Sequence, residues 1–116
     1  MKSICIAAVA FLFFAFTISD RLTGTWQGAN NMGTYRLNFT PDHTYELIVN
    51  DKPRVSGVYT LTDSIFTIED YGCPNIIGRY KLQFFGNDDS CRFLLIDDGC
   101  DNRAAQADGA MVVKVK

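Results

Sequence analysis

The sequence predicts an all-β domain of about eight antiparallel strands that close into an up-and-down barrel, with one short helical turn before the last strand. Three observations favour this fold class. Turn residues recur roughly every ten residues, the runs between them are short, and several runs alternate apolar with polar side chains. A chain of 116 residues holds one such domain.

The turn signals delimit the expected strands. We expect strands at 22–27, 35–39, 45–47, 55–62, 65–70, 78–84, 91–96 and 111–115. The pair Asp63-Ser64 predicts a tight hairpin between the fourth and fifth of them. Helical propensity is confined to 103–107, which we expect to cover the barrel between the last two strands.

The alternation of side chains predicts antiparallel strands with one face toward water. One set of alternate positions is apolar in three of the expected strands, and the positions between are mostly polar. We therefore expect these alternate apolar residues to face the core: Tyr35, Leu37 and Phe39, then Tyr80, Leu82 and Phe84, then Met111, Val113 and Val115.

Residues 1–19 have the plan of a secretory signal peptide, a short basic start followed by an apolar run without a charge until Asp20. The run is shorter than the ~20 apolar residues of a spanning helix. Thr17 and Ser19 are the small residues that favour cleavage after Ser19. We expect a domain of residues 20–116, secreted or periplasmic and with no membrane span once the signal is cleaved. The alternative is an uncleaved anchor helix.

Three cysteines remain after such cleavage, and an oxidising compartment favours pairing two of them. Cys91 lies inside an apolar stretch, where a cysteine is most often a small buried hydrophobe. Cys73 and Cys100 lie among turn residues. We expect a Cys73–Cys100 disulfide and a buried thiol at Cys91.

Charge and motif content exclude several classes of function. The formal net charge is −2 and no basic stripe is present, which argues against nucleic-acid binding. The single histidine, His43, lies in a turn, and no common hydrolase, phosphate-binding or redox motif occurs, so we expect neither an enzyme, nor a metal site, nor a cofactor. Acidic residues gather at 87–89 and 97–102, where solvated turns are the first interpretation and a calcium loop is the alternative.

Aromatic residues at inward positions allow two interpretations of the barrel interior. An eight-stranded barrel is just wide enough to be filled by side chains or to hold one small ligand. The many rings favour a filled core. Buried tyrosine hydroxyls need hydrogen-bond partners, which favours a ligand site that uses Tyr35, Tyr45, Tyr59 and Tyr80.

A series of short motifs resembles the lipocalins and related calycin barrels, and in particular small secreted bacterial lipocalin-like domains. The motifs are Gly24-x-Trp26, Gly57-x-Tyr59-x-Leu61, Cys73-Pro74 before Gly78-x-Tyr80, and Leu94-x-Ile96-x-Asp98-x-Cys100-x-x-Arg103. The resemblance implies that Trp26 packs at a closed end of the barrel and that Arg103 covers its ring. The alternative is a surface Arg103 paired with Asp101 or Asp108.

Two functions follow as expectations. The first is an exported, non-catalytic protein that binds a small apolar or aromatic molecule in the barrel. The second is a protein-interaction module, an inhibitor or accessory subunit of a secreted enzyme, that acts through loops on a filled barrel. A cavity lined by tyrosines favours the first, whereas a solid interior with an exposed apolar loop favours the second.

Overall fold

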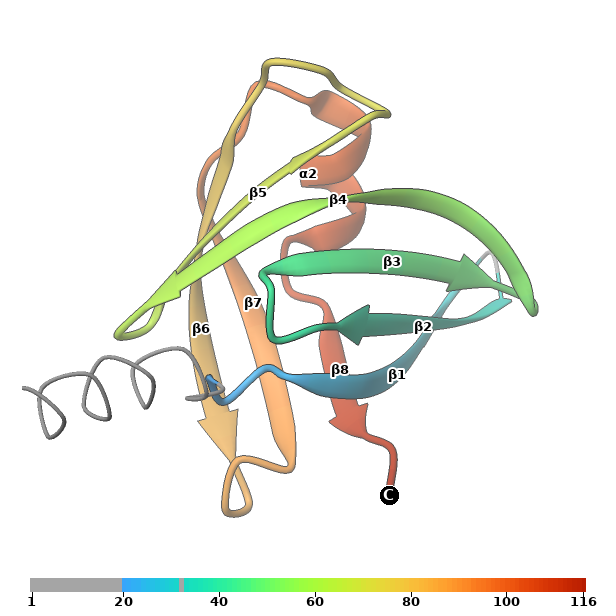
Figure 1. Ribbon diagram of the computed structural model, residues 1–116, viewed down its shortest axis with the longest axis vertical. Coiled ribbons are helices and arrows are strands. Elements are labelled where there is room, and N and C mark those ends of the chain that lie inside the picture. Colours follow the sequence, from blue (N-terminus) through green and yellow to red (C-terminus); the bar gives the residue numbers. More distant parts are fainter. Residues whose placement is uncertain (1–19, 32) are drawn as a thin grey trace, which may run out of the picture.

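The computed structural model describes residues 20–31 and 33–116, and the predicted signal peptide lies outside them. The chain forms an eight-stranded antiparallel barrel with each strand paired to its sequence neighbours and β1 paired to β8 (Figure 1). This confirms the predicted fold class. The elements are β1 (Gly24–Asn30), β2 (Gly33–Phe39), β3 (Thr44–Val49), β4 (Lys52–Thr62), β5 (Ile65–Asp70), β6 (Gly78–Phe85), β7 (Ser90–Asp97), α2 (Asp101–Ala107) and β8 (Met111–Lys114).

The first strand begins two residues later than predicted and extends three residues further. Residues 20–23 form a turn in which the Asp20 carboxylate accepts hydrogen bonds from the amides of Leu22 and Thr23, at 2.9 and 3.0 Å. Leu22 is fully buried although it is outside the strand. Burial, rather than strand conformation, explains its apolar side chain.

The last strand faces the opposite way from the prediction. Val112 is fully buried, whereas Met111 and Val113 are exposed. The register pairs Val112 with Cys91, a buried residue of β7. A shift of one residue in the pairing register exchanges the two faces of a strand. The pairing with Cys91 therefore fixes Val112, and not its neighbours, on the inner face of β8.

The core of the barrel contains a cluster of aromatic rings. Phe39 lies 4.9 Å from Tyr59 between ring centroids, and Phe66 lies 5.3 Å from Phe93, both edge to face. Such pairs contribute about 0.5–1.5 kcal/mol each beyond the burial of their area. The remaining buried hydrophobic side chains of the barrel cluster are Leu22, Trp26, Tyr45, Tyr80, Leu82, Cys91 and Val112.

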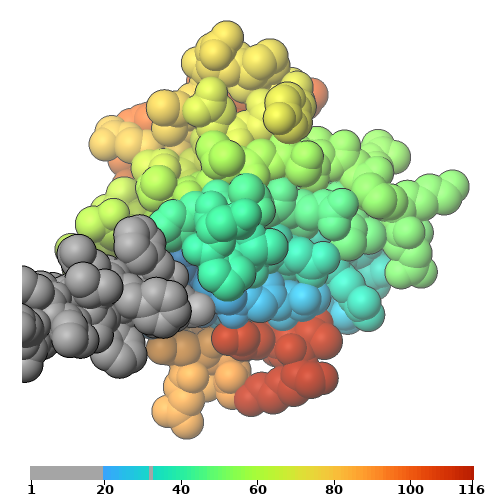
Figure 2. Space-filling model, viewed as in Figure 1, coloured from blue at the N-terminus to red at the C-terminus, as the bar shows by residue number. Residues whose placement is uncertain are grey.

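Loops project from the barrel at separate places. The β5–β6 loop projects at one end of the molecule and the β3–β4 hairpin projects to one side (Figures 1 and 2). The helix α2 has no fully buried residue, and it connects β7 to β8.

Candidate ligand-binding site

A cavity of about 410 Å³ lies inside the barrel, between the aromatic cluster and the projecting loops. Its volume falls in the range of small-molecule sites. Rings of the core, among them Phe39, Phe66 and Phe93, line it on one side. The other lining residues come from the strands, the β5–β6 loop, α2 and the residues that flank α2: Asn30, Tyr35, Leu37, Tyr45, Leu47, Val49, Arg54, Val55, Ile68, Asp70, Gly72, Cys73, Tyr80, Cys100, Asn102, Arg103, Gln106, Ala107, Ala110 and Val112.

Three of the four tyrosines proposed for ligand binding line this cavity. They are Tyr35, Tyr45 and Tyr80. Tyr59 does not line it, because its hydroxyl reaches the turn at the start of the domain, where it donates to the Asp20 carboxylate at 3.0 Å. The barrel interior therefore contains both a packed aromatic cluster and a cavity beside it.

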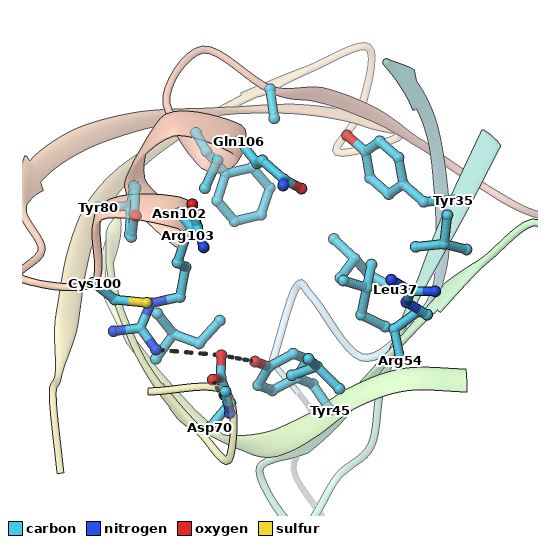
Figure 3. A pocket seen from close by; sticks show the side chains of 18 of the residues that line it. Tyr35, Leu37, Tyr45, Arg54, Asp70, Tyr80, Cys100, Asn102, Arg103 and Gln106 are labelled. Carbon is cyan, nitrogen blue, oxygen red and sulfur yellow. Dashed lines mark hydrogen bonds and ion pairs between the residues drawn. The ribbon is translucent and has the colours of Figure 1, made fainter. Parts of the chain in front are cut away.

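Arg103 is the centre of a buried polar network beside the cavity (Figure 3). Its Nε and Nη2 donate to the two carboxylate oxygens of Asp98, both at 2.8 Å. Its Nη1 donates to Asp70 at 3.2 Å, and Nη2 also donates to the Ile76 carbonyl at 2.8 Å. The side chains of Arg103, Asp70 and Asp98 are 9, 7 and 0% exposed. Every guanidinium nitrogen thus has an acceptor within the protein.

Two tyrosines complete the network. The Tyr45 hydroxyl donates to Asp70 at 2.5 Å and the Tyr80 hydroxyl donates to Asp98 at 2.6 Å. Burial, and then the hydrogen bond to a carboxylate, raises the pKa of each tyrosine far above its ordinary value. Both hydroxyls therefore remain protonated donors at any physiological pH.

The carboxyl group of Asp98 is held ionised by its neighbours. Burial by itself would raise its pKa, but hydrogen bonds from Arg103, Tyr80 and the Cys100 amide lower it further than burial raises it. The hydrogen bonds to Asp98 raise the pKa of Arg103, despite burial. The two groups therefore form a buried charged pair beside the cavity.

The predicted Cys73–Cys100 disulfide is present, with its Cα atoms 6.0 Å apart. It joins the β5–β6 loop to the residue that precedes α2. Because Arg103 contacts both Asp70 and Ile76, the same loop and helix are also joined by hydrogen bonds. Cys91 is the buried free thiol that was expected, and burial raises its pKa to about 12.

Trp26 packs at the other end of the barrel from Arg103. Its indole nitrogen donates to the Leu22 carbonyl at 2.8 Å, and its ring meets Phe84, near the end of β6, edge to face. The cation over the ring is Lys114, 5.5 Å from the centroid. Arg103 instead lies near the start of β6 with Asp98 and Asp70, so neither the predicted stacking on Trp26 nor the alternative surface pair describes its position.

The sequence reasoning missed the two carboxylates of the network. Asp98 belongs to the acidic stretch 97–102 that we interpreted as a solvated turn, yet its side chain is fully buried. Its neighbour Asp97 points outward and pairs with Arg79. Strict alternation from the buried Cys91 and Phe93 would have placed Asp97 inside the barrel. An irregular pairing, in which Tyr80 pairs with Leu95 and Arg79 with Asp97, reverses this order, and no local signal in the sequence indicates it. Asp70 at the end of β5 carried no local signal either.

The remaining candidates form no metal site in the described part of the chain. Across residues 20–31 and 33–116, no group of three or more histidine, cysteine, aspartate or glutamate residues is arranged to hold a metal ion. His43 is exposed, and its Nε2 lies 3.9 Å from the Asp20 carboxylate. No helix within the same residues is long and apolar enough to cross a membrane.

No protein-family model, curated protein or solved structure matches this chain. The closed eight-stranded antiparallel barrel is compatible with a lipocalin-like fold. A fold alone does not determine a function, because one fold can carry many different sites.

Proposed function

We propose that this protein is an exported, non-catalytic binding protein of lipocalin-like type that holds a small apolar or aromatic molecule in the barrel. The observation that carries the proposal is the cavity of about 410 Å³ inside a folded barrel, with aromatic rings on one side and tyrosines at its wall. A domain of this size gains stability from every buried apolar group, so an unfilled cavity in its core costs stability unless a ligand occupies it.

The walls of the cavity favour an apolar body with few polar groups. Aliphatic and aromatic side chains make up most of its surface, including Leu37, Leu47, Val49 and Ile68. The polar groups of Tyr45 and Tyr80 are already hydrogen-bonded to carboxylates and add little to recognition. A ligand therefore gains affinity mainly from burying apolar surface, at about 25 cal/mol per Å² before the costs of association.

A cavity-filling variant tests this proposal. Ala107→Phe places a ring where α2 lines the cavity, and Ala105→Phe places the same ring on the exposed face of the same helix. We expect the parent protein and Ala105→Phe to release a common small molecule when the native, purified proteins are analysed by mass spectrometry. Ala107→Phe should release none of it. Equal release from all three proteins would contradict the proposal.

Exposed apolar residues favour interaction with a protein as the second candidate. Tyr71 and Ile77 on the β5–β6 loop are 82 and 56% exposed. A secreted partner enzyme that bound this loop would lose affinity for Tyr71→Ser, while the occupancy of the cavity would not change. Size-exclusion chromatography of the protein with its native secreted fraction distinguishes the two functions.

A further inference from the structure

The charged residues around the cavity differ in whether they already have a partner. Asp70 and Arg103 line the cavity and pair with each other. Arg54 also lines it, but its side chain has no ion pair or hydrogen bond with any residue in the described part of the chain. The cavity therefore presents one positive group that the protein itself does not neutralise.

A β-bulge makes Arg54 an extra residue of its strand. Leu47 and Ile48 are adjacent on β3, yet they pair with Val55 and Pro53 on β4, and Arg54 between those two has no partner opposite. Bulges reorient a side chain and occur often beside functional sites. Proline, which cannot donate to a strand ladder, is typical of such a position. At this bulge Arg54 both lines the cavity and remains exposed to solvent.

Tyr35 offers a second donor on the same side of the cavity. Figure 3 shows Tyr35, Leu37 and Arg54 together, across the cavity from Arg103 and Tyr80. Unlike the hydroxyls of Tyr45 and Tyr80, the Tyr35 hydroxyl has no hydrogen-bond partner among residues 20–31 and 33–116. Burial raises the pKa of Tyr35, so the hydroxyl keeps its proton.

The position of Tyr35 depends on the absence of a side chain at Gly28. A Cβ atom at Gly28 would lie 2.6 Å from both the Cζ atom and the hydroxyl oxygen of Tyr35. The ring therefore lies directly over the β1 backbone, and its hydroxyl is held at the wall of the cavity. Arg54 and the Tyr35 hydroxyl are thus two donors on one wall of the cavity without an acceptor among the described residues, whereas Arg103 and Asp70, which also line it, are paired with each other.

We infer that the ligand is an amphipathic organic anion whose single acid group lies against Arg54 and Tyr35 and whose apolar body extends toward Phe39, Phe66 and Phe93. The inference rests on the proposed function, because it assigns a chemical class to the ligand of the same cavity. The planar guanidinium matches the two oxygens of a carboxylate or sulfonate. Arg103 does not compete for this group, since Asp98, Asp70 and the Ile76 carbonyl already accept its hydrogen bonds.

A matched pair of fluorescent probes tests the charge preference. 8-Anilinonaphthalene-1-sulfonate and N-phenyl-1-naphthylamine share the same rings, and only the first carries an acid group. We expect Arg54→Gln to weaken binding of the sulfonate about tenfold, as the loss of one charge-assisted hydrogen bond implies, and to leave binding of the neutral probe within twofold. Tyr35→Phe should weaken the sulfonate about threefold, in line with the loss of one neutral hydrogen bond.

Lys52→Gln is the control, because it removes the same charge from the same strand at an exposed residue that does not line the cavity. It should leave both affinities unchanged, and Ala107→Phe should abolish both. If both probes bind the parent protein and Arg54→Gln changes their affinities equally or not at all, the anion inference is overturned while the binding function stands. If neither probe binds the parent protein, or both bind Ala107→Phe as well as the parent, the proposed function and this inference both fail.

Discussion

Replacing Arg103 with methionine tests the buried polar network most directly. The substitution keeps an unbranched chain of similar length and removes four hydrogen bonds, two to Asp98, one to Asp70 and one to the Ile76 carbonyl. The three charged side chains of the network are each less than a tenth exposed. The variant therefore leaves two carboxylates beside the barrel interior without their shared cation.

The magnitude follows from the cost of leaving a buried charge without its partner. At roughly 1.5–3 kcal/mol for each hydrogen bond to a charged group, four bonds would sum to more than a domain of this size can lose. Such contributions are not additive within one network, and Tyr45 and Tyr80 still donate to the two carboxylates. Removal of one member of a buried ion pair costs about 3–5 kcal/mol, and we expect a loss in that range.

Urea denaturation monitored by Trp26 fluorescence provides the measurement, since Trp26 is the only tryptophan and is fully buried. Arg79→Met is the control, because Arg79 forms an ion pair with Asp97 in which both side chains are about half exposed. Screening by water makes such a pair contribute little. If Arg103→Met lost no more stability than Arg79→Met, the network would not stabilise the fold, and the reasoning would be refuted.

Four further predictions concern stability and processing. Reduction of the Cys73–Cys100 disulfide should lower the free energy of unfolding by about 3–4 kcal/mol, measured by urea denaturation with and without a thiol reductant, and an equal midpoint would contradict this. Trp26→Ala should cost about 3–5 kcal/mol as a fully buried large-to-small change, measured by denaturation followed by circular dichroism, and a loss below 1 kcal/mol would show that the indole is not well packed. The pKa of Asp98 is lowered in the folded state, so the stability that its ionised carboxylate contributes is complete above its unfolded pKa of about 4 and is lost as the pH falls through the folded pKa. Asp98→Asn should therefore reduce the loss of stability that the parent protein shows below about pH 4. An unchanged dependence of stability on pH would show that Asp98 does not cause this loss. Amino-terminal sequencing of the protein from its native compartment should begin near Asp20, whereas an intact initiator methionine on membrane-bound protein would refute signal cleavage.

Local patterns in the sequence predicted the strands well, because alternation and turn residues act over a few positions. The strands from β2 to β7 lie close to the predicted ranges. The position of the last strand was predicted correctly, but its inner and outer faces were exchanged, because Val112 and its neighbours Met111 and Val113 are all apolar. Only the pairing of Val112 with Cys91 distinguishes the inner face from the outer one, and this pairing is a tertiary contact.

The candidate site was predicted only in part, and the missing part is long-range. Three of the four tyrosines line the cavity as their inward positions indicated. The contact between Asp70 and Arg103 joins residues 33 apart, and no spacing rule expresses it. The resemblance placed Arg103 over Trp26, but two buried carboxylates at the other end of the barrel bind this arginine more strongly than a ring can.

The contact between Gly28 and Tyr35 has a consequence for how this protein can evolve new specificity. Gly28 does not line the cavity, yet even a methyl group there would collide with the Tyr35 ring and push it away from the β1 backbone. A single mutation on β1 would therefore change the volume and the polarity of the cavity without touching a ligand. In a family of descendants, residue 28 would be a site at which selection adjusts the ligand indirectly, while the residues in contact with it stay the same.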